Sequence, residues 1–109
     1  MATRSRIAVR NTNYEGYTSI YVHWDGSPDT RLPLLNEYWT DESKLRELMD
    51  GGSVSSLHTT IIDTVFYARD RGDELDIKYS ESLTELKYDT GSMDEEYLYI
   101  FENNTWTVR

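Results

Sequence analysis

The sequence predicts an α+β fold: a mostly antiparallel sheet of about five or six strands with one or two helices packed on one face. Three observations support this prediction. Residues 6–11 and 17–24 alternate apolar and polar side chains, residues 40–52 place apolar side chains at helical spacing, and residues 96–109 form two aromatic, β-branched runs around a turn. With 109 residues, the chain is long enough for one domain, residues 1–109, and not for two.

The first two alternating segments predict a β-hairpin. Segments 6–11 and 17–24 both repeat an apolar side chain every second residue, which is typical of a half-buried strand. Gly16 lies in the short connection between them, and connections of this kind join antiparallel strands. The Gly-Ser-Pro sequence at residues 26–28 ends the second strand.

Two helical segments follow. Residues 31–39 have helical character after Pro33, because proline is tolerated in a first helical turn. Residues 40–52 form the clearest helix, with capping residues at both ends and apolar residues three and four positions apart. The expected caps are Thr40 or Asp41 and Gly51, and the expected buried stripe is Leu45, Leu48 and Met49.

The region after these helices gives weaker signals. Residues 53–68 favour a helix or turn that Ser53 caps, followed by a strand near residues 63–68. Residues 83–89 fit either a helix or a strand. The other segments are expected to be a charged loop, a strand and an acidic loop, at residues 69–74, 75–80 and 89–96.

The last segment is the best hairpin in the chain. Asn103 and Asn104 separate its two runs, and asparagine tolerates the positive φ that a two-residue type I′ turn requires. This turn fixes which side chains lie opposite one another on the sheet. The opposed pairs are Phe101 with Trp106 and Tyr99 with Val108.

Negative charge is the strongest global feature of the chain. Twenty acidic residues against eleven basic ones give a net charge of −9. Residues 55–109 hold twelve of the acidic residues and only five of the basic ones. Such a charge repels nucleic acid and suits a basic partner, which includes proteins that themselves bind nucleic acid. The same charge also serves simple solubility.

The composition argues against several classes of protein. There are no cysteines, so disulfides and thiolate metal sites are excluded. No apolar run reaches the roughly 18–20 residues of a membrane span. The basic N-terminus also lacks the apolar stretch of a secretory signal. We therefore expect a cytoplasmic protein that has no cofactor and does not associate with membranes.

The stretch HWDG contains the first candidate binding residues. On an extended backbone Tyr21, His23 and Asp25 share one face, whereas Trp24 is expected to be a packing anchor on the apolar face. A histidine beside a carboxylate can act as a general base, bind a metal or form a structural pair. We favour a structural or recognition role and predict no metal site. The residues that could otherwise complete a metal site are Asp29 and His58.

The segment ARDRGDE, residues 68–74, contains the second set. Arg69 and Arg71 could bind a carboxylate or phosphate as part of a recognition loop. In the favoured alternative, the charges of this segment neutralise one another in a solvated turn, and Gly72 supplies the bend. The acidic candidates in the segment are Asp70, Asp73 and Glu74.

Residues 70–96 contain the third set, an acid-rich stretch with ten acidic and three basic residues. Acids spread along a rigid sheet edge could imitate a phosphate backbone and occupy the nucleic-acid groove of another protein. A plain solvated face is the favoured alternative. The remaining candidate binding residues of this stretch are Asp94, Glu95 and Glu96.

The chain contains no nucleophile motif, phosphate-binding loop or paired-histidine helix, and we predict no catalytic residue. Its segments IYVHWDGSPD, LLNEYW, GGSVSSL, FYARDRGDE and EYLYIFENNTWTV resemble, in this order, a group of small bacteriophage and prophage proteins with HWDG-type and RDRG-type motifs. The likeness spans residues 17–108 and implies a viral origin, but no mechanism. Ser27 departs from the group's pattern, which has an aromatic residue after HWDG.

These features favour a binding protein over an enzyme. We expect a small acidic phage protein that binds a host or defence protein in the cytoplasm of an infected bacterium and modulates its activity, with inhibition favoured over activation, without contacting nucleic acid directly. Two alternatives stay open. One is a minor structural or assembly protein of the virion. The other is a small enzyme or ligand-binding domain that uses Tyr21, His23, Asp25, Arg69 and Asp70.

Overall fold

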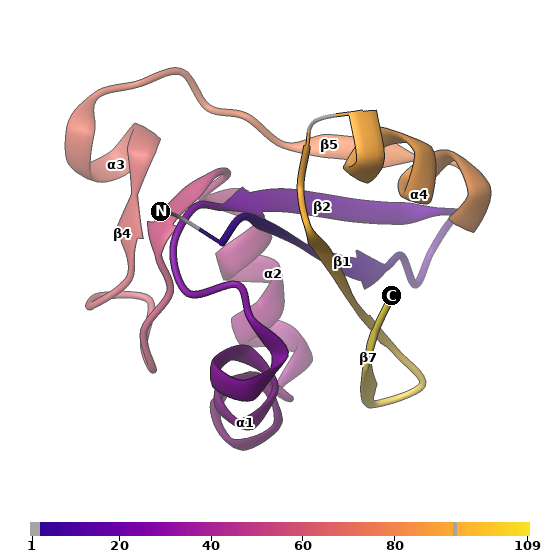
Figure 1. Ribbon diagram of the computed structural model, residues 1–109, viewed down its shortest axis with the longest axis horizontal. Helices are drawn as coiled ribbons and strands as arrows, with labels where there is room; N and C mark the ends of the chain where they lie inside the picture. Colours follow the sequence, from indigo (N-terminus) through magenta and orange to yellow (C-terminus); the bar gives the residue numbers. More distant parts are fainter. Residues whose placement is uncertain (1–2, 93) are drawn as a thin grey trace.

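The computed structural model describes residues 3–92 and 94–109 (Figure 1). Over these residues the chain forms seven strands and four helices, which together make an α+β fold. The strands are β1 (Ser5–Arg10), β2 (Tyr17–Val22), β3 (Val54–Ser56), β4 (Val65–Phe66), β5 (Lys78–Ser80), β6 (Tyr97–Glu102) and β7 (Thr105–Val108). The helices are α1 (Pro28–Tyr38), α2 (Glu42–Asp50), α3 (Tyr67–Arg71) and α4 (Leu83–Ser92).

All seven strands belong to one mixed, mostly antiparallel sheet. Its order is β4-β3-β2-β1-β6-β7, and β5 pairs with β2 off this path. The β1–β6 and β2–β3 pairs are parallel, and the remaining pairs are antiparallel. Strands β3 and β5 contact different parts of β2: Val54 pairs with Val22, whereas β5 pairs with residues 17–19. The predicted fold class is confirmed.

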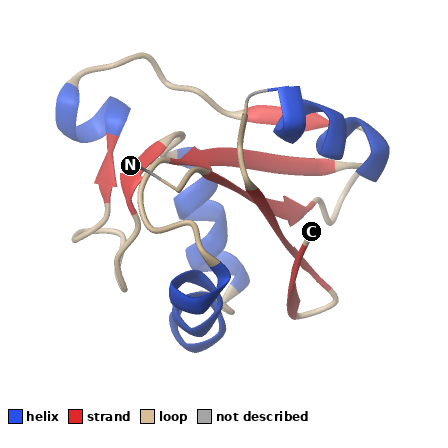
Figure 2. Cartoon of the chain, in the orientation of Figure 1, coloured by secondary structure: helices blue, strands red, loops and turns tan. Residues whose placement is uncertain are grey.

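Both faces of the sheet are covered by helices (Figure 2). The main core lies on the face of α1 and α2, where strand residues such as Ile7 and Ile20 pack against Leu35 and Leu48. The opposite face packs on α4, whose Leu86 forms a smaller cluster. The strand residues of that cluster are Ala8, Tyr17, Leu98 and Ile100. Helices α1 and α2 thus share one face, as predicted, and α4 covers the other.

The two predicted hairpins are both present. Strands β1 and β2 pair antiparallel through a connection that contains Gly16. In the β6–β7 hairpin, Asn103 and Asn104 have φ angles of 55° and 59°, as the type I′ prediction requires. The predicted opposed pairs are confirmed: Phe101 with Trp106 and Tyr99 with Val108.

Helix α2 also follows its prediction. Asp41 caps its N-terminus and accepts a hydrogen bond from the backbone N–H of Ser43 at 3.1 Å. Gly51 is the C-cap, and the buried residues are Leu45, Leu48 and Met49. Helix α1 begins earlier than predicted, at Pro28, so Pro33 lies inside the helix and not in its first turn. Strand β2 ends at Val22, before the Gly-Ser-Pro sequence that was expected to end it; this sequence instead starts the helix, because proline suits the first helical position.

The middle of the chain differs most from the prediction. Ser53 does not cap a helix, because β3 follows it directly. The strand expected near residues 63–68 is reduced to the two residues of β4, and the first three residues of the expected charged loop belong to α3. Of the strand expected at residues 75–80, β5 contains only the last three residues.

Residues 83–89, which fitted either a helix or a strand, are helical and belong to α4. It also includes residues 89–92, the first part of the expected acidic loop. Ser82 accepts a hydrogen bond from the backbone N–H of Glu85, and the Glu85 carboxylate accepts one from the N–H of Glu81. Ser82-Leu-Thr-Glu85 matches the capping-box sequence, a local signal for a helix start that the prediction for residues 83–89 did not include.

Trp24 is not the packing anchor that the alternating pattern predicts. Strand β2 ends at Val22, and the side chain of Trp24 is 43% exposed. Asp25 has a φ of 58°, a left-handed conformation that is uncommon for residues other than glycine. The two-residue period therefore ends before Trp24, and the chain turns away from the sheet.

Candidate functional site

The predicted HWDG residues form a local pair and not an open site. The hydroxyl of Tyr21 lies 2.5 Å from Nδ1 of His23, and burial raises the pKa of Tyr21. The His23 ring also contacts the edge of Trp24, with the ring centroids 4.7 Å apart. Asp25 points to solvent. The hydroxyl of Tyr21 and Nδ1 of His23, which could bind a ligand, therefore contact each other instead.

The backbone of this motif is fastened to the rest of the fold. His23 and Trp24 donate their N–H groups to the carbonyls of β3 residues at 2.9 and 3.0 Å. The carbonyl of Gly26 accepts a hydrogen bond from the hydroxyl of Tyr99, and burial raises the pKa of Tyr99 to about 12. Gly26 also lies so close to Thr3 that an added Cβ would be 2.5 Å from its carbonyl oxygen. The motif therefore has a structural role in joining β2 to α1.

The side chains of the RDRG motif are likewise engaged within their own region. Arg69 donates hydrogen bonds to the carbonyls of Ile61, Ile62 and Thr64, which braces the loop before β4. Asp70 accepts one from the N–H of Phe66 at 2.8 Å and so caps the start of α3. The side-chain hydrogen bonds from Arg69, followed by this backbone bond, lower the pKa of Asp70.

The two motifs do not converge. Arg71 stacks over the ring of Tyr67 at 5.3 Å, and Gly72 ends α3 in the left-handed conformation. Across residues 3–92 and 94–109, no hydrogen bond or ion pair joins Arg69, Asp70 or Arg71 to Tyr21, His23 or Asp25. In the same residues, no group of three or more potential metal ligands gathers around Asp29 or His58.

The acidic candidates divide into exposed residues and one buried residue. Glu95 is buried, and its carboxylate accepts hydrogen bonds from Nε and Nη2 of Arg6 at 2.8 and 3.0 Å. Burial raises the pKa of Glu95, and the hydrogen bonds from Arg6 act in the opposite direction. Glu95 therefore contributes no exposed carboxylate to the surface. The exposed candidates are Asp70, Asp73, Glu74, Asp94 and Glu96.

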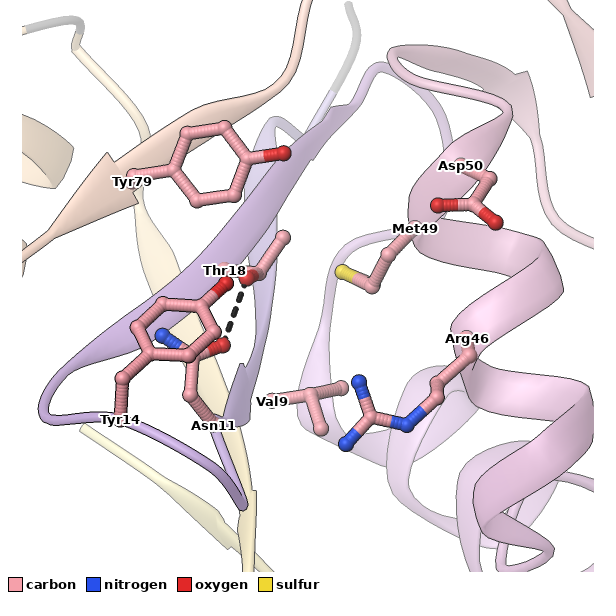
Figure 3. Close-up of a pocket in the computed structure, with 8 residues that line it drawn as sticks. All are labelled: Val9, Asn11, Tyr14, Thr18, Arg46, Met49, Asp50 and Tyr79. Carbon is pink, nitrogen blue, oxygen red and sulfur yellow. Dashed lines mark hydrogen bonds between the residues drawn. The ribbon is translucent and has the colours of Figure 1, made fainter.

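A pocket of about 230 Å³ lies between the β1–β2 hairpin, β5 and α2 (Figure 3). Tyr14 and Tyr79 form one wall, while Arg46, Met49 and Asp50 of α2 face them from the other side. The β2–β5 register brings this wall together, because Tyr79 pairs with Thr18. The full lining consists of Val9, Asn11, Tyr14, Thr18, Arg46, Met49, Asp50 and Tyr79.

A second, more open pocket of about 670 Å³ adjoins the first. The two pockets share Asn11, Tyr14 and Tyr79, so the tyrosines stand where they meet. The second pocket adds residues from the hairpin turn, the end of β5 and the start of α4, namely Glu15, Ser80, Glu81 and Glu85. We call the two pockets together the tyrosine groove.

The groove is rich in unused acceptors. Tyr14 and Tyr79 are each 61% exposed, a large exposure for aromatic side chains. Within residues 3–92 and 94–109, neither tyrosine hydroxyl has a hydrogen-bond partner, and neither does the carboxylate of Asp50. The groove's one arginine, Arg46, already donates to Thr12 at 2.6 Å and to Glu42 at 3.1 Å.

The electrostatics of the groove favour a positively charged ligand. Among the described residues that line it are four carboxylates and one basic side chain, that of Arg46. Asp50 ends α2, whose last turn has no basic residue, so a negative charge lies at the negative end of the helix dipole. A bound cation would relieve this repulsion. The four carboxylates belong to Glu15, Asp50, Glu81 and Glu85.

Sequence reasoning missed this site. Tyr14 lies in the predicted turn that contains Gly16, Tyr79 lies in the strand predicted at residues 75–80, and neither tyrosine was a candidate binding residue. The available signal was local: each tyrosine has a glutamate within two residues, in YEG and in YSE. That signal gives no distance between the two tyrosines, because their proximity depends on the β2–β5 pairing.

No family model, curated protein or solved structure matches the chain. The resemblance to phage proteins therefore stays a prediction. Among the residues that the structure describes, no helix is both long and apolar enough to cross a membrane.

Proposed function

We propose that this protein is a phage-encoded, non-enzymatic binding protein that holds a basic segment of a host or defence protein in the tyrosine groove and inhibits that partner in the cytoplasm of the infected bacterium. One observation carries the proposal. The groove presents four carboxylates around two exposed tyrosines, and its only basic side chain is already bonded elsewhere. Tyrosines in such a position supply apolar contact area and a polar tip for recognition.

The charge of the whole chain supports the same partner. A net charge of −9 raises the local concentration of a basic partner and speeds its association at low ionic strength. The effect depends on salt, because exposed charges are screened beyond about 8 Å at physiological ionic strength. The proposal thus predicts an interaction that is strong at low salt and weak at high salt.

The positions of the two sequence motifs favour binding over catalysis. A small enzyme that used Tyr21, His23, Asp25, Arg69 and Asp70 would need these side chains around one reacting group. Instead, Arg69 braces a loop, Asp70 caps a helix, and Tyr21 contacts His23. The tyrosine groove contains neither motif.

The proposal is tested by capturing partners from bacterial lysate with two variants of equal charge. In the groove variant Glu15→Lys/Glu81→Lys, the reversed charges repel a basic segment. In the control variant Glu37→Lys/Asp63→Lys, the same reversal is made at exposed acids outside the groove. We expect the wild-type protein and the control to capture the same basic protein in stoichiometric amount at low salt, and to inhibit its activity. The groove variant should capture at least tenfold less.

Two results would overturn the proposal. One is equal capture by the groove and control variants, because the contact would then lie elsewhere. The other is the absence of any stoichiometric partner at low salt.

A further inference from the structure

We infer that the tyrosine groove recognises arginine: one arginine side chain of the partner inserts beside Tyr14 and Tyr79, and its guanidinium donates hydrogen bonds to the carboxylate of Asp50. The inference rests on the proposed function of this groove and goes beyond it by naming the chemical group that the groove selects. It follows from the arrangement of the aromatic rings, from the unused hydrogen-bonding groups and from the size of the pocket.

The rings of Tyr14 and Tyr79 lack the cation that two other tyrosines of this molecule have. Arg10 lies over the ring of Tyr17 at 5.9 Å, and Arg71 lies over Tyr67 at 5.3 Å. No cation within residues 3–92 and 94–109 stacks in this way on Tyr14 or Tyr79. A guanidinium binds the face of such a ring through attraction to its π electrons and through stacking of the two planar groups. An arginine of the partner would form with Tyr14 or Tyr79 the cation–π contact that Arg10 and Arg71 form with Tyr17 and Tyr67.

The hydrogen-bonding groups of the groove complement a guanidinium. Arginine has five N–H donors and no acceptor. The two tyrosine hydroxyls and the Asp50 carboxylate face the smaller pocket and can accept hydrogen bonds, whereas Arg46, beside Asp50, uses its Nη2 for Thr12 and Glu42 (Figure 3). Thr18 does not compete for these groups, because it donates to Asn11 at 2.7 Å.

Arginine fits this arrangement better than lysine. A planar guanidinium can lie against a ring while its edge donates two N–H groups to one carboxylate. An ammonium group is a strongly hydrated point charge that cannot do both in a fixed geometry. Tyr14 and Tyr79 face a wall in which the Asp50 carboxylate lies beside Met49 and Arg46, so a ring and a carboxylate lie on opposite sides of the pocket.

The volume of the smaller pocket agrees with a single side chain. Its 230 Å³ lies below the roughly 300–1,000 Å³ of typical small-molecule sites. The larger, open pocket then receives neighbouring residues of the partner near Glu15, Glu81 and Glu85. The groove therefore fits an arginine within a longer basic segment.

The inference is tested by titrating the isotope-labelled protein with three short peptides and following its amide NMR signals. The peptides are Ac-Gly-Arg-Gly-NH₂ and its lysine and citrulline versions; citrulline keeps the shape of arginine but has no charge. We expect the arginine peptide to shift signals of residues around the groove and to bind at least threefold more tightly than the lysine peptide. The citrulline peptide should cause no saturable shift.

Variants assign the contacts. Asp50→Asn should weaken binding of the arginine peptide about tenfold, because a hydrogen-bonded charge pair is lost. Tyr14→Ala and Tyr79→Ala should each weaken it about threefold. The matched control is Tyr88→Ala, since Tyr88 is also exposed, at 74%, but lies outside the groove. All four positions are exposed, so the variants should fold normally.

The outcomes separate this inference from the proposed function. Equal binding of the arginine and lysine peptides, or no effect of Asp50→Asn and the tyrosine variants, overturns arginine selection even if the groove variant loses its captured partner. Conversely, selective binding of the arginine peptide supports the site even if lysate yields no partner, which would refute the proposed function alone.

Discussion

Two arginines of this molecule are almost completely buried, and they have opposite surroundings. Arg6 of β1 is 2% exposed and donates to both oxygens of Glu95 and to the hydroxyl of Ser19. Arg31 of α1 is 1% exposed and donates one hydrogen bond, to the carbonyl of Trp24 at 2.6 Å. Among the described residues, Nε and Nη1 of Arg31 have no partner.

The difference shows two roles of a buried arginine: Arg6 forms an ion pair, and Arg31 holds a backbone carbonyl. Arg6 connects β1 to β2 and to the segment after α4, and its charge is balanced by a carboxylate. Arg31 mainly fixes the backbone where HWDG turns into α1, and burial lowers its pKa. Removing a partner from a buried ion pair leaves an uncompensated charge, whereas removing an unpaired charge leaves none. The two arginines should therefore respond differently to the same substitution.

The largest effect is expected for Arg6→Met. Methionine fills a similar volume but leaves the Glu95 carboxylate buried without a cation, which should lower the free energy of unfolding by about 3–5 kcal/mol at pH 7. Urea-induced unfolding, followed by circular dichroism, measures this loss. The exposed Arg10→Met is the control and should cost only about 1 kcal/mol, because Arg10 forms a surface pair with Glu102 and a cation–π contact with Tyr17.

The double variant Arg6→Met/Glu95→Leu sharpens the interpretation. Replacing both members of a buried pair with apolar residues is often neutral or stabilising. The double variant should therefore be more stable than Arg6→Met alone. A double variant as unstable as the single one would show that packing, and not the unpaired carboxylate, causes the loss.

A smaller effect is expected from pH. The pKa of Glu95 is raised by burial, so its contribution to stability is fully present below the usual glutamate pKa and is lost as the pH rises through the raised value. Without the hydrogen bonds from Arg6, this pKa rises further. The destabilisation by Arg6→Met should thus be smaller at pH 5 than at pH 7. Urea unfolding of the wild-type protein and of Arg6→Met at both pH values measures this difference. Groups common to both proteins cancel in the comparison, including Asp70, whose lowered pKa gives stability the opposite dependence on pH.

Local patterns in the sequence predict much of the fold. Both hairpins and α2 depend on neighbouring residues: alternation, an Asn-Asn turn, and an Asp41 cap. The burial of Arg6 could not be predicted in this way. Its strand was interpreted as half-buried, and the polar face is covered only because α4 packs there. Since residues 83–89 fitted either a helix or a strand, nothing indicated that this face was enclosed.

The candidate site was harder to predict for the same reason. The charged motifs HWDG and RDRG are conspicuous in the sequence, but their hydrogen bonds stabilise turns and a short helix. The tyrosine groove depends on the pairing of β5 with β2, which joins residues far apart in the chain. Periodicity predicts which residues share a face of one strand, but it does not say which strands are neighbours.

The smallest effect is expected for Arg31→Met. The substitution removes one hydrogen bond to the carbonyl of Trp24, which destabilises the fold, but it also removes a buried cation with two unpartnered nitrogens. These effects oppose each other, so the free energy of unfolding should change by less than about 1 kcal/mol at pH 7. Urea unfolding beside Arg6→Met gives the comparison under identical conditions. A loss as large as that of Arg6→Met would mean that Arg31 has a compensating partner in solution, and the contrast between the two buried arginines would then fail.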